Sequence, residues 1–154
     1  MTDTNTNKSE PKQQFEIQRI YLKGLSFETT DTPKVFVQEW KPTTNVDINC
    51  TPSSLDTDSH EVVLKVTVTT KLGDKAAYLV EVEQAGIFSL KGFKEEEQRY
   101  MLRTICPTIL FPYASELIAS TINRGTFPSL FLQPINFEAL YQQQLQQAKD
   151  ETKH

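Results

Sequence analysis

The chain has 154 residues, a formal net charge of −4 at pH 7 and an isoelectric point of about 5.2. This length suits one domain, and the acidic balance argues against a duplex nucleic-acid binder, which needs a basic surface to displace counterions. The N-terminus has no apolar signal-peptide core, and no run reaches the roughly 20 apolar residues of a membrane span. We therefore expect a soluble, cytosolic protein, and its charge permits a basic partner.

Polar tails are predicted at both ends of the chain. Residues 1–13 carry no hydrophobic periodicity and are expected to be disordered, and residues 148–154 are expected to be a flexible tail. The residues between them, 14–147, are predicted to form a single domain. The two cysteines, Cys50 and Cys106, make no disulfide framework; one disulfide is possible, but free buried thiols are expected in a reducing compartment.

The first predicted strand covers residues 15–28 and changes the parity of its apolar positions. Phe15 and four further apolar residues share one parity, whereas Ile20 and Leu22 have the other. Either a bulge shifts the phase or both faces are covered, and the second option suggests a partner subunit. Residues 29–45 hold two prolines and are expected to be an extended crossover loop with aromatic anchors, followed by a short strand at 46–50.

The middle of the chain predicts an antiparallel hairpin. Residues 62–68 and 78–83 both alternate apolar and polar positions, and residues 72–75 provide the turn between them. One face of this hairpin is expected to be exposed to solvent. Leu79 has the parity of that face and lies two residues before Glu81, so it is either a stray surface leucine or a hydrophobic anchor suited to a short basic partner segment.

Helices are predicted in the last third. Residues 95–104 form a short helix with an acidic first turn, which breaks at Cys106-Pro107. A second, apolar helix then runs to residue 124, with Pro112 in its first turn or at a kink. Gly125 is expected to end this helix with a positive φ.

A final helix is predicted after Asn136, which can cap it. Its apolar stripe holds Phe137, Leu140, Tyr141 and Leu145, and its other face is rich in glutamine. Because strands come first and helices last, the order predicts an α+β domain with an antiparallel sheet and helices on one face.

The helix through residues 109–122 is apolar on nearly every side. Such a helix must be covered all round, and a chain of this length has few layers with which to cover it. The expected cover is a second copy of the chain. An oligomer that leaves apolar surface exposed suggests a binding protein.

No catalytic constellation is recognisable. His60 lies beside a predicted turn and His154 at the end of the chain, no cysteine pair has zinc spacing, and no glycine-rich loop has phosphate-binding character. Cys106 is expected to be a buried structural thiol. Glu81 and Glu83 share one strand face and are expected to be a solvated acidic surface. The sequence therefore predicts no enzyme and no metal site.

A series of motifs covers nearly all of the chain except its tails. They are IQRIY at 17–21, SFE at 26–28, EVVLKVTVT at 61–69, GIFSL at 86–90, CPTILFPYA at 106–114, RGTFPSL at 124–130 and PINFEALY at 134–141. In this order they resemble the bacterial SecB export chaperones, and CPTILFPYA and RGTFPSL are highly specific. The resemblance implies a four-stranded antiparallel sheet with two main helices on one face, assembled into a homotetramer as a dimer of dimers.

The resemblance also implies a function. SecB-like proteins bind unfolded precursors in the cytosol, keep them translocation-competent and deliver them to the motor ATPase SecA, without a cofactor. The alternative is a SecB-like holder dedicated to one client, such as an antitoxin. An uncharacterised enzyme is a third hypothesis, against which the missing constellation argues.

The resemblance carries over to a SecA-binding patch on the flat face of the sheet. The family's positions fall here on Glu28, Leu79 and Glu81, which match. A fourth position, an aspartate in many members, is Gly24 here, so the patch is expected to be one charge weaker. Ser115 stands where the family usually has arginine, and this change is expected to alter subunit contacts.

A client-binding groove is implied between the crossover loop, the last helix and the sheet. The matching apolar residues could equally belong to the core. They are Phe36, Trp40, Phe137, Leu140 and Tyr141.

Overall fold

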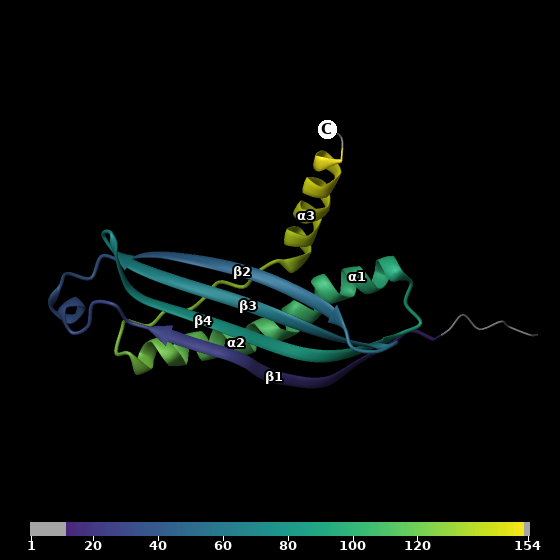
Figure 1. Cartoon of the computed structure of the whole chain (residues 1–154), viewed down its shortest axis with the longest axis horizontal. Helices are drawn as coiled ribbons and strands as arrows, with labels where there is room; N and C mark the ends of the chain where they lie inside the picture. The colour runs from purple at the N-terminus through teal and green to yellow at the C-terminus, as the bar shows by residue number, and fades with distance from the viewer. Residues whose placement is uncertain (1–11, 153–154) are drawn as a thin grey trace, which may run out of the picture.

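A computed structural model describes residues 12–152 of the chain (Figure 1). Most of the predicted N-terminal tail, residues 1–11, lies outside the described residues. The elements in chain order are β1 (Gln14–Glu28), the 3-10 turn η1 (Lys34–Val37), β2 (Thr43–Ser54), β3 (Ser59–Leu72), β4 (Lys75–Lys91), α1 (Glu95–Arg103), α2 (Ile105–Arg124) and α3 (Phe137–Glu151). The strands form one antiparallel sheet in the order β1-β4-β3-β2, which confirms the α+β prediction.

The predicted hairpin is β3 and β4. Val66 pairs with Val82 and Val68 with Val80, and all four side chains are fully buried. Their odd-numbered neighbours lie on the opposite face and are only half-buried. The alternation predicted from period two is therefore confirmed, and it defines an inner face under α2 and an outer face toward solvent.

Two bulges explain the change of parity in β1. The register with β4 shifts between Ile17 and Arg19 and again between Leu22 and Gly24. As a result, the apolar side chains of β1 lie opposite inner-face positions of β4, and Tyr21 is the exception among them. The bulge hypothesis accounts for the pattern, and Tyr21 is left on the outer face.

The crossover loop joins the two edges of the sheet, since β1 and β2 lie at opposite ends of the strand order. It is not extended throughout, because η1 interrupts it and buries Val35. The strand expected at 46–50 is longer and runs over Thr43–Ser54. Pro52 lies within it, which an edge strand tolerates because one side of its backbone needs no partner.

The helix break comes at Thr104, two residues before the predicted position. The Thr104 hydroxyl donates to the carbonyl oxygen of Tyr100 at 2.6 Å, and α2 starts at the next residue. Pro107 therefore lies in the first turn of α2, while Pro112 lies inside the helix. The break predicted at Pro107 is therefore wrong, and of the two positions predicted for Pro112 the first turn is excluded.

Helix α2 packs on the inner face of β4 and β3 and supplies much of the core. Its buried residues include Leu110, Ile118 and Ile122, which contact the apolar side of the hairpin. By length and composition alone, the stretch Glu95–Arg124 is apolar enough to cross a membrane, in contrast to the expectation from the sequence. Its burial against the sheet is that of the core helix of a globular domain.

Gly125 ends α2 as predicted, but for a different physical reason. Its φ is −80°, and the residue with positive φ is Thr126 at 62°. A Cβ atom on Gly125 would lie 2.8 Å from Cζ of Phe27 and 2.9 Å from the Phe127 ring. Glycine is needed here for space rather than for its φ.

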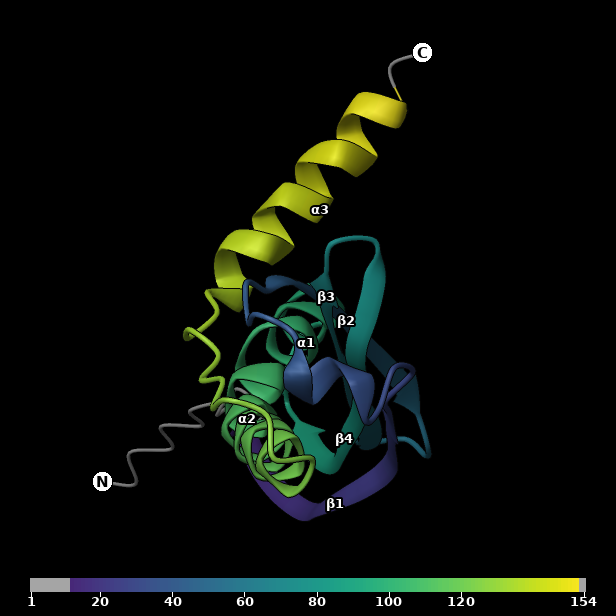
Figure 2. The ribbon, with the colours of Figure 1, turned by 90° about the vertical axis from the view of Figure 1, so that its left-hand side faces the viewer.

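Helix α3 rises away from the sheet instead of covering it (Figures 1 and 2). Its base contacts α1 and α2, and the predicted cap is confirmed, because Asn136 Oδ1 accepts from the Ala139 backbone N–H at 2.9 Å. The helix continues to Glu151, so the boundary predicted after residue 147 falls inside it. The sheet face is therefore covered by α2, and α3 forms a separate arm.

Candidate functional site

The predicted SecA-binding residues lie together on the outer face of the sheet. Glu28 on β1 is directly opposite Leu79 on β4, and Glu81 is two residues farther along the same face of β4. Glu28 is exposed, and the other two are half-buried. We call these three residues the acidic patch. The hairpin and the edge strand thus place a leucine between two carboxylates.

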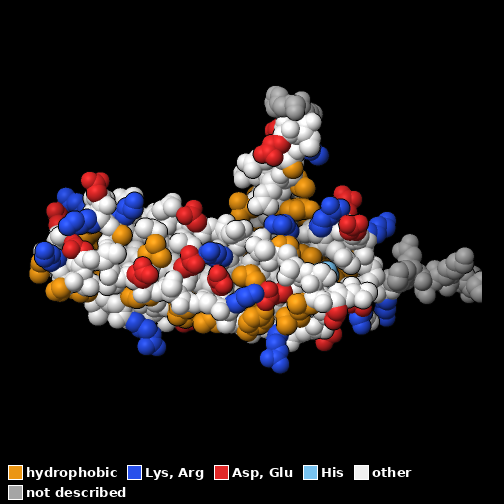
Figure 3. All heavy atoms as spheres, in the orientation of Figure 1, with side chains coloured by type: hydrophobic (Ala, Val, Ile, Leu, Met, Phe, Trp, Pro, Cys, Tyr) orange, Lys and Arg blue, Asp and Glu red, His pale blue; other side chains and the backbone are white. Residues whose placement is uncertain are grey.

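The Glu81 carboxylate already has partners within the chain. Lys65 Nζ lies 3.5 Å from Glu81 Oε1, and the Thr67 hydroxyl donates to Glu81 Oε2 at 3.2 Å. This ion pair is exposed to solvent and contributes little to stability. Figure 3 shows that carboxylates on this face are mixed with lysine or arginine side chains and scattered apolar ones. A basic partner would have to compete with Lys65 for Glu81.

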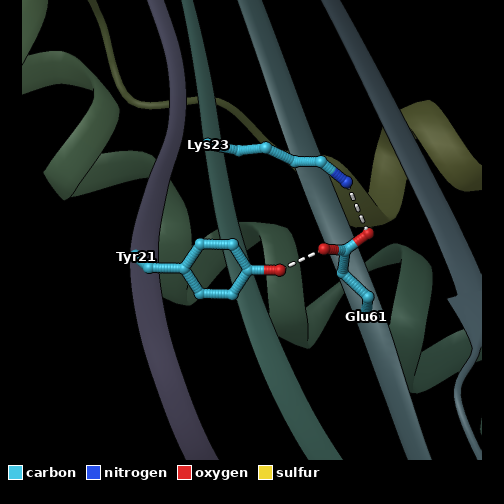
Figure 4. A network of polar contacts seen from close by, with 3 residues as sticks. All are labelled: Tyr21, Lys23 and Glu61. Carbon is cyan, nitrogen blue, oxygen red and sulfur yellow. Dashed lines mark hydrogen bonds and ion pairs between the residues drawn. The ribbon is translucent and has the colours of Figure 1, made fainter.

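A second polar cluster lies farther along the outer face (Figure 4). The Tyr21 hydroxyl on β1 donates to Glu61 on β3, across β4, where Ala85 is the residue opposite Tyr21. Lys23, the extra residue of the second bulge, pairs with Glu61 at 2.9 Å. The bulge therefore directs a lysine toward a carboxylate two strands away.

This cluster shifts two protonation equilibria. Burial, reinforced by the hydrogen bond to Glu61, raises the pKa of Tyr21 to about 12. The hydrogen bond from Tyr21, followed by that from Lys23, lowers the pKa of Glu61. The cluster ties the edge strand β1 to β3.

Two of the predicted client-binding residues belong to an aromatic cluster at the end of the sheet. Phe36 and Trp40 lie 5.5 and 5.9 Å from Phe127, measured between ring centroids. Phe127 also packs on Phe27 and Tyr78. Phe36 is 51% exposed, and the cluster borders a shallow hollow of about 200 Å³. Phe127 holds the crossover loop to the sheet, although sequence reasoning did not select it as a site residue.

The other three predicted client-binding residues lie at the base of α3. Phe137 is buried and its ring lies 6.1 Å from that of Phe111, and Tyr141 meets Tyr100 at 6.0 Å. Leu140 is partly exposed and lines a hollow of about 390 Å³ between α3 and the edge strand β2.

The five predicted client-binding residues are thus divided between two places. The crossover-loop pair lies at one end of the sheet. The α3 residues lie at the base of that helix, where Phe137 and Tyr141 pack on α2 and α1 and Leu140 faces the hollow beside β2. The segment 127–136 connects them, and Leu130, Leu132 and Ile135 in it pack against the core. Phe137 contributes to packing rather than to an open surface.

The outward side of α2 borders the largest of these hollows, about 630 Å³. Ser115 lies there, half-buried, together with Pro112, Glu116 and Phe131. Phe131 is 77% exposed. Ser115 therefore stands on the outward surface of α2.

The cysteines have the character of structural thiols. Burial raises the pKa of Cys50 to about 11, with Arg103 acting in the opposite direction, and burial also raises the pKa of Cys106. Within residues 12–152, no group of three or more His, Cys, Asp or Glu side chains is placed to hold a metal ion. The chemistry that the site offers is apolar contact and charge.

Comparisons with known proteins identify the family. A family described as "Preprotein translocase subunit SecB" matches residues 8–148. The chain belongs to the SecB family. "Protein-export protein SecB" of Legionella pneumophila (strain Corby) is 51% identical over 154 residues, covering 96% of this chain and 95% of the relative. The protein of the same name from Marinobacter nauticus is 46% identical over 147 residues, covering 96% and 88%.

A solved structure shares the fold of this SecB-family chain. It is described as the Mycobacterium tuberculosis Rv1957 SecB-like chaperone in complex with a ChAD peptide from the Rv1956 HigA1 antitoxin. It matches with a TM-score of 0.67 and 17% identity, over 79% of this chain and 90% of that chain. At this identity the similarity supports the architecture of sheet and helices.

Proposed function

We propose that this SecB-family chain is an ATP-independent cytoplasmic chaperone, which binds unfolded precursor proteins, keeps them translocation-competent and delivers them to SecA. The observation that carries the proposal is the identity of about half of all positions to export proteins over nearly the full chain. The alternative, a holder dedicated to one client, is not favoured. The antitoxin-bound neighbour is only 17% identical to this chain.

Holding would be passive. An unfolded client exposes apolar side chains, and burying them contributes roughly 25 cal/mol per Å². The exposed Phe36 with the hollow beside it, and the hollow between α3 and β2, offer two such apolar surfaces. The free edge of β2 could pair with client backbone groups, so affinity need not depend on one sequence. At micromolar concentration and an association rate of about 10⁶ M⁻¹s⁻¹, capture takes about a second.

Assembly into a homotetramer, a dimer of dimers, is part of the proposal. Exposed apolar residues on the inner side of the edge strand β1, such as Leu22 at 47%, support it. So does the outward side of α2, where Tyr113 is 51% exposed. Light scattering at micromolar concentration tests this point, and a 17.6 kDa monomer would contradict it.

Release would come from handover to SecA, because the sequence offers no nucleotide-binding loop. The acidic patch would dock a basic segment of SecA while the client stays bound elsewhere. The test is a titration of SecA into the wild-type protein and the Glu81→Lys variant. We expect the charge reversal to weaken binding at least tenfold, since it also places two lysines side by side. Unchanged affinity would refute docking at this patch.

A further inference from the structure

A third carboxylate, that of Glu83, lies beside the two of the acidic patch. Gly24 on β1 and Glu83 on β4 are cross-strand partners on the outer face. A Cβ atom on Gly24 would lie 3.4 Å from Glu83 Oε2 and 3.8 Å from Glu83 Cβ. The Glu83 carboxylate therefore lies over the glycine, next to the space that a side chain on residue 24 would fill.

Glu83 differs from Glu81 in its charge partners. Lys65 is opposite Glu83 in the strand register, yet its ammonium pairs with Glu81. Among the ion pairs of residues 12–152, none involves Glu83. Glu81 therefore has an ion-pair partner, and among the described residues Glu83 has none.

We propose that Glu83 is a docking carboxylate of this chain, which replaces the charge missing at Gly24 and receives a basic segment of SecA. The inference rests on the proposed function, since it concerns the same surface. A carboxylate on β4 that leans over residue 24 offers its charge at nearly the place where an aspartate on β1 would offer it. Glycine at position 24 leaves the room for this arrangement.

The proposal accounts for the composition of the surface. Glu28 lies opposite Leu79, and Glu81 and Glu83 follow Leu79 along the same face of β4. Lys65 pairs with one of these three carboxylates, that of Glu81. A basic segment that meets this surface finds two carboxylates, those of Glu28 and Glu83, that are in no ion pair of the described residues. Charges at the rim of an interface mainly affect the association rate and its salt dependence, so Glu83 should act through both.

The test is calorimetric titration with a C-terminal peptide of SecA at ionic strengths of about 0.01 M and about 0.15 M, where the Debye length is about 30 Å and about 8 Å. We expect Glu83→Gln to weaken binding about two- to fivefold at low salt and to reduce the salt dependence. The double variant Gly24→Asp/Glu83→Gln should bind the peptide with an affinity within about twofold of the wild-type affinity. Glu16→Gln, on the outer side of β1 at its other end, is the matched control and should leave binding unchanged.

The variants separate failure of this inference from failure of the proposed function. If Leu79→Ala and Glu81→Gln weaken binding but Glu83→Gln does not, the role of Glu83 is refuted while docking on this face stands. If Glu83→Gln weakens binding but Gly24→Asp does not restore it, replacement of the missing charge is refuted. If none of these substitutions changes binding, the proposed docking surface itself is wrong. Circular dichroism of each variant checks that the sheet is folded.

Discussion

Replacing Gly125 with alanine tests the close contact between the end of α2 and the aromatic cluster. The new Cβ atom would lie 2.8 to 2.9 Å from the rings of Phe27 and Phe127, well inside van der Waals contact. Phe127 also touches Tyr78 and Trp40, so it cannot move without disturbing the crossover loop. Overpacking of this kind costs about 1–3 kcal/mol.

The net effect follows from two opposing contributions. The φ of −80° at Gly125 is one that alanine also adopts. Alanine lowers the conformational entropy of the unfolded chain, and this gain offsets about 0.4–1 kcal/mol of the overpacking cost. We therefore expect a loss of about 1–2 kcal/mol in the free energy of unfolding, or about 2–8 °C in Tm for a chain of this size. Thr126→Gly should have the opposite sign, because it removes a β-branched residue at φ 62°.

The assay is urea unfolding at one protein concentration, followed by the fluorescence of Trp40, the single tryptophan. Its ring lies 5.9 Å from that of Phe127, so displacement of Phe127 should also change the emission of the native protein. Gly24→Ala is the control, since its Cβ would meet only ordinary contacts. If Gly125→Ala is as stable as the wild type and its emission is unchanged, the steric reasoning is wrong.

Further predictions concern the outer-face cluster, the α3 cap and the thiols. Tyr21→Phe should lower the free energy of unfolding by about 1 kcal/mol in urea titrations; no loss would show that the cluster does not stabilise β1. Because Tyr21 and Lys23 lower the pKa of Glu61, this carboxylate adds stability above about pH 4.3 that is lost as the pH falls through the lowered pKa. Glu61→Gln should flatten that acid slope, and an unchanged slope would contradict the assignment. Asn136→Ala should reduce hydrogen-exchange protection in the first turn of α3 by about 1 kcal/mol, with Asn123→Ala as a control. Burial and the raised pKa of Cys50 predict that a thiol reagent at pH 8 reacts far more slowly with the native than with the unfolded protein; equal rates would refute burial.

The hairpin could be predicted because its signal is local. Each residue from 62 to 68 has a side chain on a known face once the period is two, and the turn residues fix the partner strand. The change of parity in β1 could not be explained in this way, because a bulge and a strand covered on both faces are compatible with the same pattern of apolar residues. Only the pairing with β4 distinguishes them.

The placement of the helices depended on contacts between distant parts of the chain. Asn136 predicts where α3 begins, but nothing in its amphipathic stripe says that the helix leaves the sheet. The same holds for Gly125, whose neighbours Phe27 and Phe127 come from distant and adjacent segments. A glycine after a helix usually predicts a residue with positive φ. At Gly125 glycine is needed because a Cβ atom would be too close to the two aromatic rings.

The candidate sites could likewise be predicted only where a local sequence signal existed. Motif positions on β1 and β4 placed Glu28, Leu79 and Glu81 on one surface, and the strand register brings them together. Glu83 was left as a solvated acid, since its contact with Gly24 follows from cross-strand pairing. The client residues were chosen by side-chain type, and the structure divides them between two surfaces.

The central claim is that the chain holds unfolded precursors of unrelated sequence without nucleotide. Its most direct test is the refolding of several slow-folding precursors, diluted from denaturant into an equimolar amount of the assembled protein in the absence of ATP. The account predicts that refolding and aggregation of each precursor are arrested, and that adding SecA restores release. Arrest of one client alone would favour a dedicated holder, and unchanged refolding of all of them would contradict the account.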